Sequence, residues 1–67
     1  MNSSVHTEVL YAASPFELAS KIEALRLAKL KFALNTNQRF EVTDIKQAFH
    51  PGDCEATVTY TLRWSEQ

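Results

Sequence analysis

The stretch S-P-F-E-L-A-S-K-I-E-A-L-R-L-A-K-L-K-F-A-L, residues 14–34, decides the fold because it predicts one long helix. Its start carries three helix-initiation signals, namely an N-cap hydroxyl, a first-turn proline and a capping-box carboxylate, at Ser14, Pro15 and Glu17. The Asn-Thr-Asn segment at 35–37 marks its end, since asparagine tolerates the left-handed backbone that closes a helix. We therefore predict a helix over about residues 14–35.

Two apolar stripes run along this helix when successive residues are turned by about 100°. The first has the spacing of a core face and consists of Leu18, Ile22, Leu25, Phe32 and Ala33. The second lies roughly opposite, in line with Phe16 in the first turn, and consists of Leu27, Leu30 and Leu34. One sheet covers one side of a helix, so the second stripe requires a wrapping sheet edge, a neighbouring subunit or solvent exposure.

Residues 4–12 precede the helix and alternate between apolar and polar side chains, which predicts a half-buried strand. Its apolar side carries Val5, Val9 and Tyr11, and we expect this side to pack against the helix. His6 and Glu8 fall on the opposite, polar side.

Two further strands are predicted over residues 38–49 and 54–64. In the strand over 38–49, the apolar residues stand at even positions at first and at odd positions later. This change indicates a β-bulge near Thr43 and Asp44, or a strand whose two halves bury opposite faces. Between the strands, Pro51 and Gly52 have the order of a type II turn. The last strand alternates regularly, with a core-facing set and a threonine-rich polar set.

These elements predict one α+β domain over residues 1–67, with the order strand, helix, strand, strand. The helix reverses the chain direction, so the first two strands run parallel and the last runs antiparallel to both. Placing the last strand between them gives a three-stranded antiparallel sheet packed on one helix. Its strong β-propensity suits that central position.

Composition narrows the function classes. The net charge of -1 and pI of about 6.0 make nucleic-acid binding unlikely. The N-terminus has no signal-peptide pattern, and no apolar run approaches the roughly 20 residues that span a bilayer. One cysteine and no export signal favour a cytoplasmic location. A chain of 67 residues buries a small core, so we expect self-association, that is, a homo-oligomer.

No residue pattern indicates catalysis or metal binding. Cys54 lies near His50, but its direct neighbours Asp53 and Glu55 oppose thiolate formation, so a buried structural cysteine is favoured. A structural zinc site requires four ligands, and the chain offers only two histidines, far apart in sequence, and a single cysteine. We therefore expect a protein that is not an enzyme, without a metal site.

Several short motifs over residues 5–64 resemble the dodecins, small flavin-binding proteins with the order strand, long helix, strand, strand. The matching pieces are Ser-Pro at 14–15, Phe-Glu-Val at 40–42, Gly52 and the alternating residues 55–59. The resemblance implies a hollow dodecamer and flavin as the ligand. In that family a tryptophan before Phe-Glu-Val stacks on the flavin and a third-strand glutamine bonds its ring, whereas this chain has Arg39 and Thr57 there. A second, equally loose likeness, in Val-Thr-Asp-Ile-Lys at 42–46, is to small sporulation-associated and phage proteins.

Two hypotheses of function follow. The first is a homo-oligomer that stores or sequesters a small aromatic, flavin-like or nucleotide-like ligand, bound at Arg39, Thr57, Thr59 and Arg63. The second is an adaptor or inhibitor, of phage type, that binds another protein through the helix or a sheet edge. Contacts with a second chain, of either kind, are predicted at Leu27, Leu30, Leu34 and Trp64.

Overall fold

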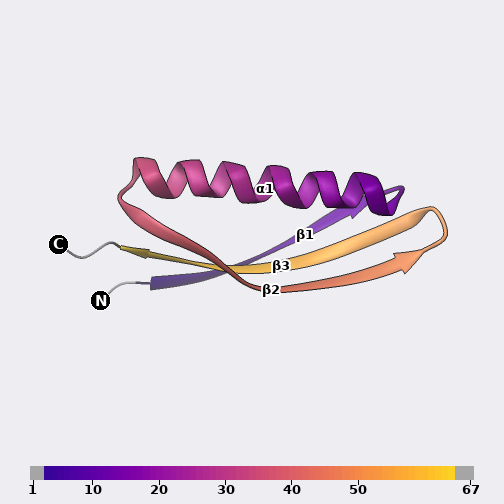
Figure 1. Cartoon of the computed structure of the whole chain (residues 1–67). Helices are drawn as coiled ribbons and strands as arrows, with labels where there is room; N and C mark the ends of the chain where they lie inside the picture. Colours follow the sequence, from indigo (N-terminus) through magenta and orange to yellow (C-terminus); the bar gives the residue numbers. More distant parts are fainter. Residues whose placement is uncertain (1–2, 65–67) are drawn as a thin grey trace.

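One helix lies along a three-stranded antiparallel sheet (Figure 1). A computed structural model describes residues 3–64. Its elements are β1 (Ser3–Ala12), α1 (Pro15–Asn35), β2 (Gln38–His50) and β3 (Asp53–Trp64). The strand order is β1-β3-β2, and both β1 and β2 pair antiparallel with β3. The predicted α+β fold with a central last strand is confirmed.

Strand β3 supplies most of the buried side chains, on the parity that the sequence predicts. The buried set consists of Cys54, Ala56, Val58, Tyr60 and Leu62. The threonines between them are half-buried on the opposite face. Because β3 has a strand on each side, its helix-facing side chains are covered from three directions.

The expected orientation of β1 is wrong. Val5, Val9 and Tyr11 are exposed, whereas Ala12 on the other parity is buried and Leu10 packs against the core. The register explains this, since Leu10 pairs with Ala56 and Ala12 with Cys54 on the face beneath the helix. The small side chains of Ala12, Cys54 and Ala56 let the helix approach the sheet closely, which larger side chains would prevent.

A bulge in β2 turns the apolar residues on both sides of it toward the same face of the sheet. The register with β3 shifts between Val42 and Asp44, as predicted. Phe40 and Val42 before the bulge, and Ile45 after it, therefore pair with buried β3 residues on the helix-facing side. The following turn has Gly52 at φ 74, the backbone that the second central residue of a type II turn requires.

The helix packs on the sheet through a narrower stripe than the sequence predicts. Leu18 and Ala33 are fully buried, and Ile22 and Leu25 are partly buried. Phe32 is 49% exposed, so its assignment to the core is wrong. It lies about 100° around the helix from Ala33, and this rotation carries its ring off the narrow sheet.

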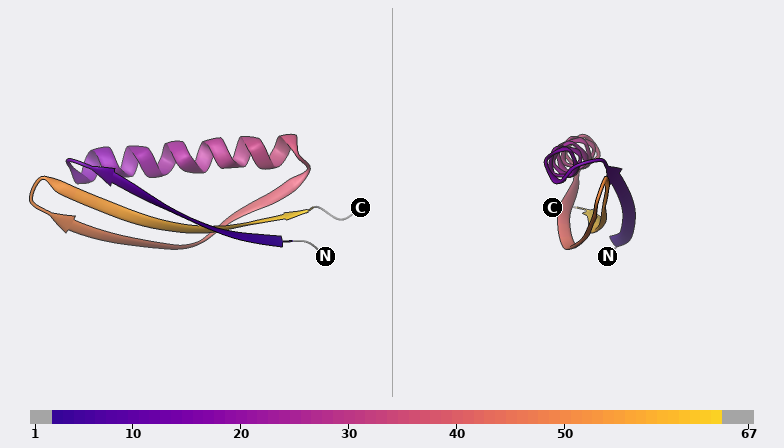
Figure 2. Two further views of the ribbon diagram at one scale, coloured as in Figure 1. Left: turned by 180° about the vertical axis from the view of Figure 1, so that it is seen from behind. Right: turned by 90° about the vertical axis from the view of Figure 1, so that its right-hand side faces the viewer.

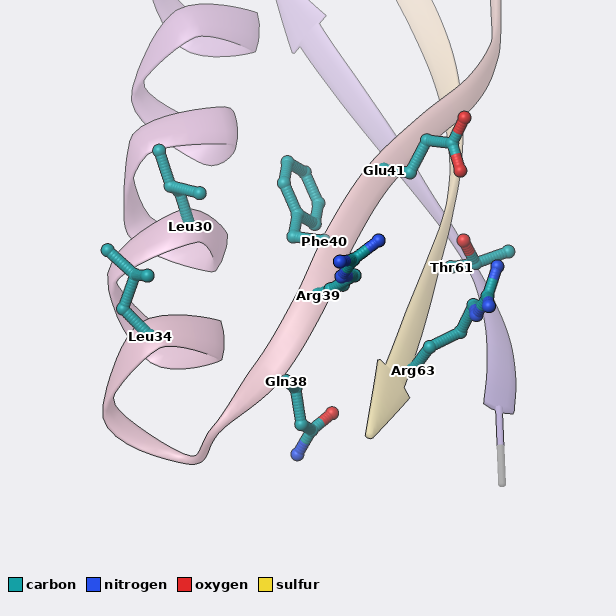
Figure 3. A pocket seen from close by; sticks show the side chains of 8 residues that line it. All are labelled: Leu30, Leu34, Gln38, Arg39, Phe40, Glu41, Thr61 and Arg63. Carbon is teal, nitrogen blue, oxygen red and sulfur yellow. The ribbon is translucent and has the colours of Figure 1, made fainter. Parts of the chain in front are cut away.

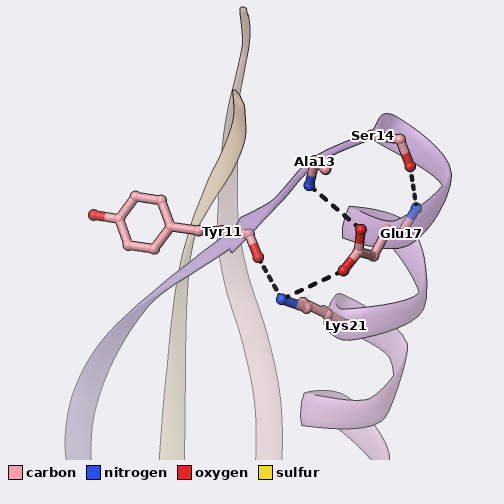
Figure 4. A network of polar contacts seen from close by, with 5 residues as sticks. All are labelled: Tyr11, Ala13, Ser14, Glu17 and Lys21. Carbon is pink, nitrogen blue, oxygen red and sulfur yellow. Dashed lines mark hydrogen bonds and ion pairs between the residues drawn. The ribbon is translucent and has the colours of Figure 1, made fainter. Parts of the chain in front are cut away.

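Both ends of α1 are capped by side chains, and at the C-terminal end Thr36 Oγ1 donates to the Phe32 carbonyl at 2.8 Å. Glu17 N–H donates to Ser14 Oγ at 3.1 Å, which confirms the N-cap (Figure 4). The Glu17 carboxylate accepts from Ala13 N–H at 3.4 Å and pairs with Lys21 at 3.8 Å, while Lys21 donates to the Tyr11 carbonyl at 2.6 Å. These contacts fasten the first helical turns to the end of β1.

Replacing Ser14 by Ala is expected to lower the free energy of unfolding by about 1 kcal/mol, because Glu17 N–H loses its acceptor. Urea denaturation followed by circular dichroism measures this change. Ser20→Ala, at an exposed position in the same helix, is the matched control and should change stability little. Equal effects of the two substitutions would contradict the capping role of Ser14.

The molecule is long and thin, with a small core. Its extents are 48 × 17 × 11 Å, and its radius of gyration is 13.5 Å, compared with about 11 Å for a compact domain of this length. The end-on view in Figure 2 shows the helix over one side of a strongly twisted sheet. Half of the buried core side chains within residues 3–64 are small, namely Ala12, Ala33, Cys54 and Ala56. Much of the large apolar surface consequently stays uncovered.

Candidate ligand-binding hollow

A hollow of about 490 Å³ lies where the end of α1, the start of β2 and the end of β3 meet (Figure 3). It is open to solvent on one side. The residues that line it are Leu30, Leu34, Gln38, Arg39, Phe40, Glu41, Thr61 and Arg63. Three segments that are distant in sequence thus contribute to one site.

Two arginines dominate the charge of this hollow. Arg39 and Arg63 are register partners on β2 and β3, and both side chains are exposed. The ion pairs within residues 3–64 involve neither of them. Like charges directly opposite one another in a sheet are destabilising, so an anion between them would relieve a repulsion. Glu41 also lines the hollow and offsets one of the two positive charges.

The helix side of the hollow is apolar. Leu30 and Leu34 project from α1 on one side of Phe40, and the arginines lie on its other side (Figure 3). A guanidinium offers a planar fork of donors that fits a carboxylate or phosphate at two points. Arg39 and Arg63 share the sheet face away from the helix, so the hollow continues around the edge strand β2. The site therefore combines a wall for an apolar or aromatic body on the helix side of β2 with two donors for an anionic group on its other side.

The structure brings together half of the residues that the sequence singles out as a site. Arg39 and Arg63 line the hollow, and so do two of the leucines assigned to partner contact. Thr57 and Thr59 share the polar face of β3 but lie outside the lining, where Thr61 is found instead. Sequence reasoning also missed Gln38, Phe40 and Glu41, although the Phe-Glu-Val motif marks this place in the chain.

The second apolar stripe of the helix faces away from the sheet. Leu27, Leu30 and Leu34 are 49%, 36% and 72% exposed. A second hollow, of about 470 Å³ and almost wholly apolar, is lined by Ala24, Leu27, Ala28, Leu30, Lys31 and Leu34. Trp64 is 51% exposed at the end of β3 and lines neither hollow.

A polar network that the sequence did not reveal joins the helix to β1. Tyr60 Oη donates to Glu8 Oε2 at 2.8 Å, and Lys29 Nζ pairs with the same carboxylate oxygen at 3.3 Å. The His6 ring stacks on Tyr60, with centroids 5.2 Å apart. The interruption of the core stripe by Lys29 was the available signal for this network. Its long side chain reaches an acceptor that only the corrected β1 orientation provides.

The contacts in this network shift three pKa values. The hydrogen bond from Tyr60 and the nearby Lys29 hold the pKa of Glu8 below its ordinary value, against a smaller opposing effect of burial. The pKa of Lys29 is raised by the Tyr60 hydroxyl and by Glu8. Burial and then the bond to Glu8 raise the pKa of Tyr60. The first two shifts favour the charged Glu8–Lys29 pair at neutral pH, and the raised pKa of Tyr60 keeps its hydroxyl protonated as the donor to Glu8.

Glu8→Gln is expected to cost about 1 kcal/mol of unfolding free energy at pH 7 and almost nothing at pH 3. A lowered carboxyl pKa stabilises the fold above the ordinary value of 4.5, and this contribution disappears as the pH falls through the folded-state pKa. Urea denaturation at both pH values measures the difference. Glu41→Gln, at an exposed strand position outside the ion pairs of residues 3–64, is the control. An equal pH dependence in both variants would contradict this assignment.

Two further observations and three comparisons bear on function. Within residues 3–64, no three His, Cys, Asp or Glu side chains gather closely enough to hold a metal ion. In the same residues, α1 lacks the apolar length needed to cross a membrane. Comparison of the chain with protein-family models, curated proteins and solved structures gives no match. The geometry of the hollow is therefore the observation that bears most directly on function.

Proposed function

We propose that this chain is a non-enzymatic, self-associating protein that stores or sequesters a flavin-like or nucleotide-like ligand in the hollow at Arg39 and Arg63. The single observation that carries the proposal is the composition of that hollow. It has an apolar wall on the helix side of the edge strand β2 and, on the other side of that strand, two arginines that have no ion-pair partner within residues 3–64. A ligand with a flat aromatic body and a terminal phosphate or carboxylate satisfies both halves of the site.

The proposed pose follows from the chemistry of the lining. The aromatic body contacts Leu30, Leu34 and the Phe40 ring, which gives affinity by burying apolar surface. The anionic group accepts hydrogen bonds from Arg39 and Arg63, and Thr61 and Gln38 supply further polar atoms. In the dodecins that the sequence resembles, the position of Arg39 carries the tryptophan that stacks on flavin. The proposed ligand would occupy the same region through different contacts.

Self-association in this proposal is supported by the uncovered apolar surface. The large apolar side chains that are at least 70% exposed include Val5, Phe16 and Leu34. On α1, Leu27, Leu30 and Leu34 line one apolar hollow, and exposed apolar patches of this kind mark interaction surfaces. Cys54 is buried and unpaired, which agrees with the proposed cytoplasmic location.

Titration with matched ligand pairs tests the proposal. We expect flavin mononucleotide and adenosine monophosphate to bind at least about tenfold more tightly than riboflavin and adenosine, which lack the phosphate. Isothermal titration calorimetry gives the affinities, and the fluorescence of Trp64, next to Arg63 in β3, gives an independent signal. Absence of binding by all four compounds would refute the proposal, as would equal affinity with and without phosphate.

A second candidate is a protein-interaction module, and the exposed stripe Leu27, Leu30 and Leu34 is the observation that favours it. An amphipathic groove or stripe of this type binds a helix of another protein. The titration separates the two candidates, because an adaptor or inhibitor needs no phosphate-bearing ligand. Its chain would also remain monomeric in isolation at concentrations where a self-associating protein forms larger species.

A further inference from the structure

The outer face of α1 carries a heptad-spaced stripe that reaches from one end of the helix to the other. Its members follow one another at intervals of four and three residues, as in the contact seam of a coiled coil, at Phe16, Ser20, Glu23, Leu27, Leu30 and Leu34. All six are exposed, and Phe16 is the most exposed large apolar side chain within residues 3–64, at 83%. The stripe lies on the side of the helix away from Leu18 and Ala33, so packing within one chain leaves it uncovered.

We propose that this stripe binds the same stripe of a second copy, with the two helices antiparallel. The inference rests on the self-association proposed above and specifies its surface and its orientation. Antiparallel pairing about the helix midpoint places Phe16 of each copy against Leu34 of the other. The apolar hollow on the helix, lined by Leu27, Leu30 and Leu34 among others, receives that phenyl ring as a knob enters a hole.

Charge complementarity fixes the antiparallel orientation. Glu17 and Lys31 lie on the same flank of the stripe, near opposite ends of the helix. In an antiparallel pair the same flanks meet, so Glu17 of one copy lies beside Lys31 of the other, twice in each dimer. On the opposite flank Arg26 meets Arg26 once, and each is already paired with Glu23 of its own helix. A parallel pair would instead bring Arg26 of one copy toward Lys31 of the other, twice in each dimer, and no attractive contact between the flanks would offset this repulsion.

The polar residues within the stripe are compatible with this contact. Glu23 is already paired with Arg26 of its own helix, at 2.6 Å, so its charge is compensated before association. The small side chains of Ala24 and Ala28 beside the stripe allow close approach of a second helix. Leu34 also lines the arginine hollow, so the contact brings Phe16 of the second copy to the apolar wall of the ligand site.

Cysteine cross-linking tests the orientation directly. Copies carrying Phe16→Cys are mixed with copies carrying Leu34→Cys under mild oxidation, and the covalent dimers are identified by mass spectrometry. We expect dimers that join position 16 to position 34 to predominate. Positions 16 of two antiparallel copies are about 27 Å apart, too far for a disulfide. Wild type, whose Cys54 is buried, is the control. Predominance of 16-to-16 and 34-to-34 dimers would overturn the antiparallel orientation.

Dimerisation of charge-swapped variants gives a second test of the orientation. Circular dichroism first checks that each variant is folded. Lys31→Glu alone should weaken dimerisation about tenfold in sedimentation equilibrium, because it sets two pairs of glutamates together. Adding Glu17→Lys should restore most of the lost dimer affinity, although it also removes the contacts of Glu17 with Ala13 and Lys21 and so lowers monomer stability. Additive losses of dimer affinity between folded chains would overturn the proposal. A mass of 7.6 kDa at all concentrations would overturn it too. Titration of such a monomer with flavin mononucleotide would then test ligand binding independently of self-association.

Discussion

Leu18→Ala is expected to lower the free energy of unfolding by about 3 kcal/mol, the largest stability effect of any substitution considered for this chain. Leu18 is fully buried and packs among Ala12, Cys54 and Ala56, whose side chains are too short to fill the cavity that the substitution leaves. Domains of this size have a total stability of roughly 3–10 kcal/mol. The variant should therefore be largely unfolded in mild denaturant, which urea titration with circular dichroism measures.

The matched control is Leu34→Ala, the same chemical change on the same helix at a side chain that is 72% exposed. Measured at low protein concentration, where association contributes little, it should change the unfolding free energy by about 0.5 kcal/mol or less. Similar losses at the two positions would show that the buried stripe is assigned to the wrong side of α1.

Replacing both Arg39 and Arg63 by Gln is expected to weaken binding of flavin mononucleotide or adenosine monophosphate about a hundredfold, with each single substitution contributing about tenfold. Hydrogen bonds to a charged group contribute about 1.5–3 kcal/mol each, and about 1.4 kcal/mol corresponds to a factor of ten. Riboflavin and adenosine should be affected much less, because they lack the anionic group. Calorimetric titration of the four ligands measures both effects.

Two further variants make this prediction specific to the hollow. Lys46→Gln removes one positive charge from an exposed position of β2 that does not line the hollow, and it should leave affinity nearly unchanged. Glu41→Gln removes the negative charge from the lining and should strengthen binding of the phosphate-bearing ligands. An equal loss in Lys46→Gln and in the arginine variants would mean that the net charge of the protein, and not this site, attracts the anion.

The sequence predicted those parts of the fold that depend on local chemistry. The N-cap at Ser14 and the turn at Gly52 follow from side-chain and backbone preferences within a few residues. The alternation of β3 follows from one central strand that is covered on one face. The bulge between Val42 and Asp44 was visible because the apolar parity had to be restored along one strand.

The parts that failed depend on which strand residues meet across the sheet. In β1, the larger apolar residues Val5, Val9 and Tyr11 predicted that their side of the strand faces the helix. The structure has the opposite side there, because Ala12 pairs with Cys54 beneath Leu18. That reversal also brings Glu8 to Lys29 and Tyr60, so the polar network could not be found before the register was known. The hollow was found in part, because Arg39 and Arg63 were chosen for their chemistry while their direct pairing came from the register.

Native mass spectrometry of the protein purified from its source tests the central claim most directly, because one spectrum reports both subunit number and retained ligand. The proposed function, with the antiparallel helix pair, predicts even multiples of the 7.6 kDa chain that carry a phosphate-bearing aromatic compound. A spectrum of the bare 7.6 kDa chain at every concentration sampled would contradict it.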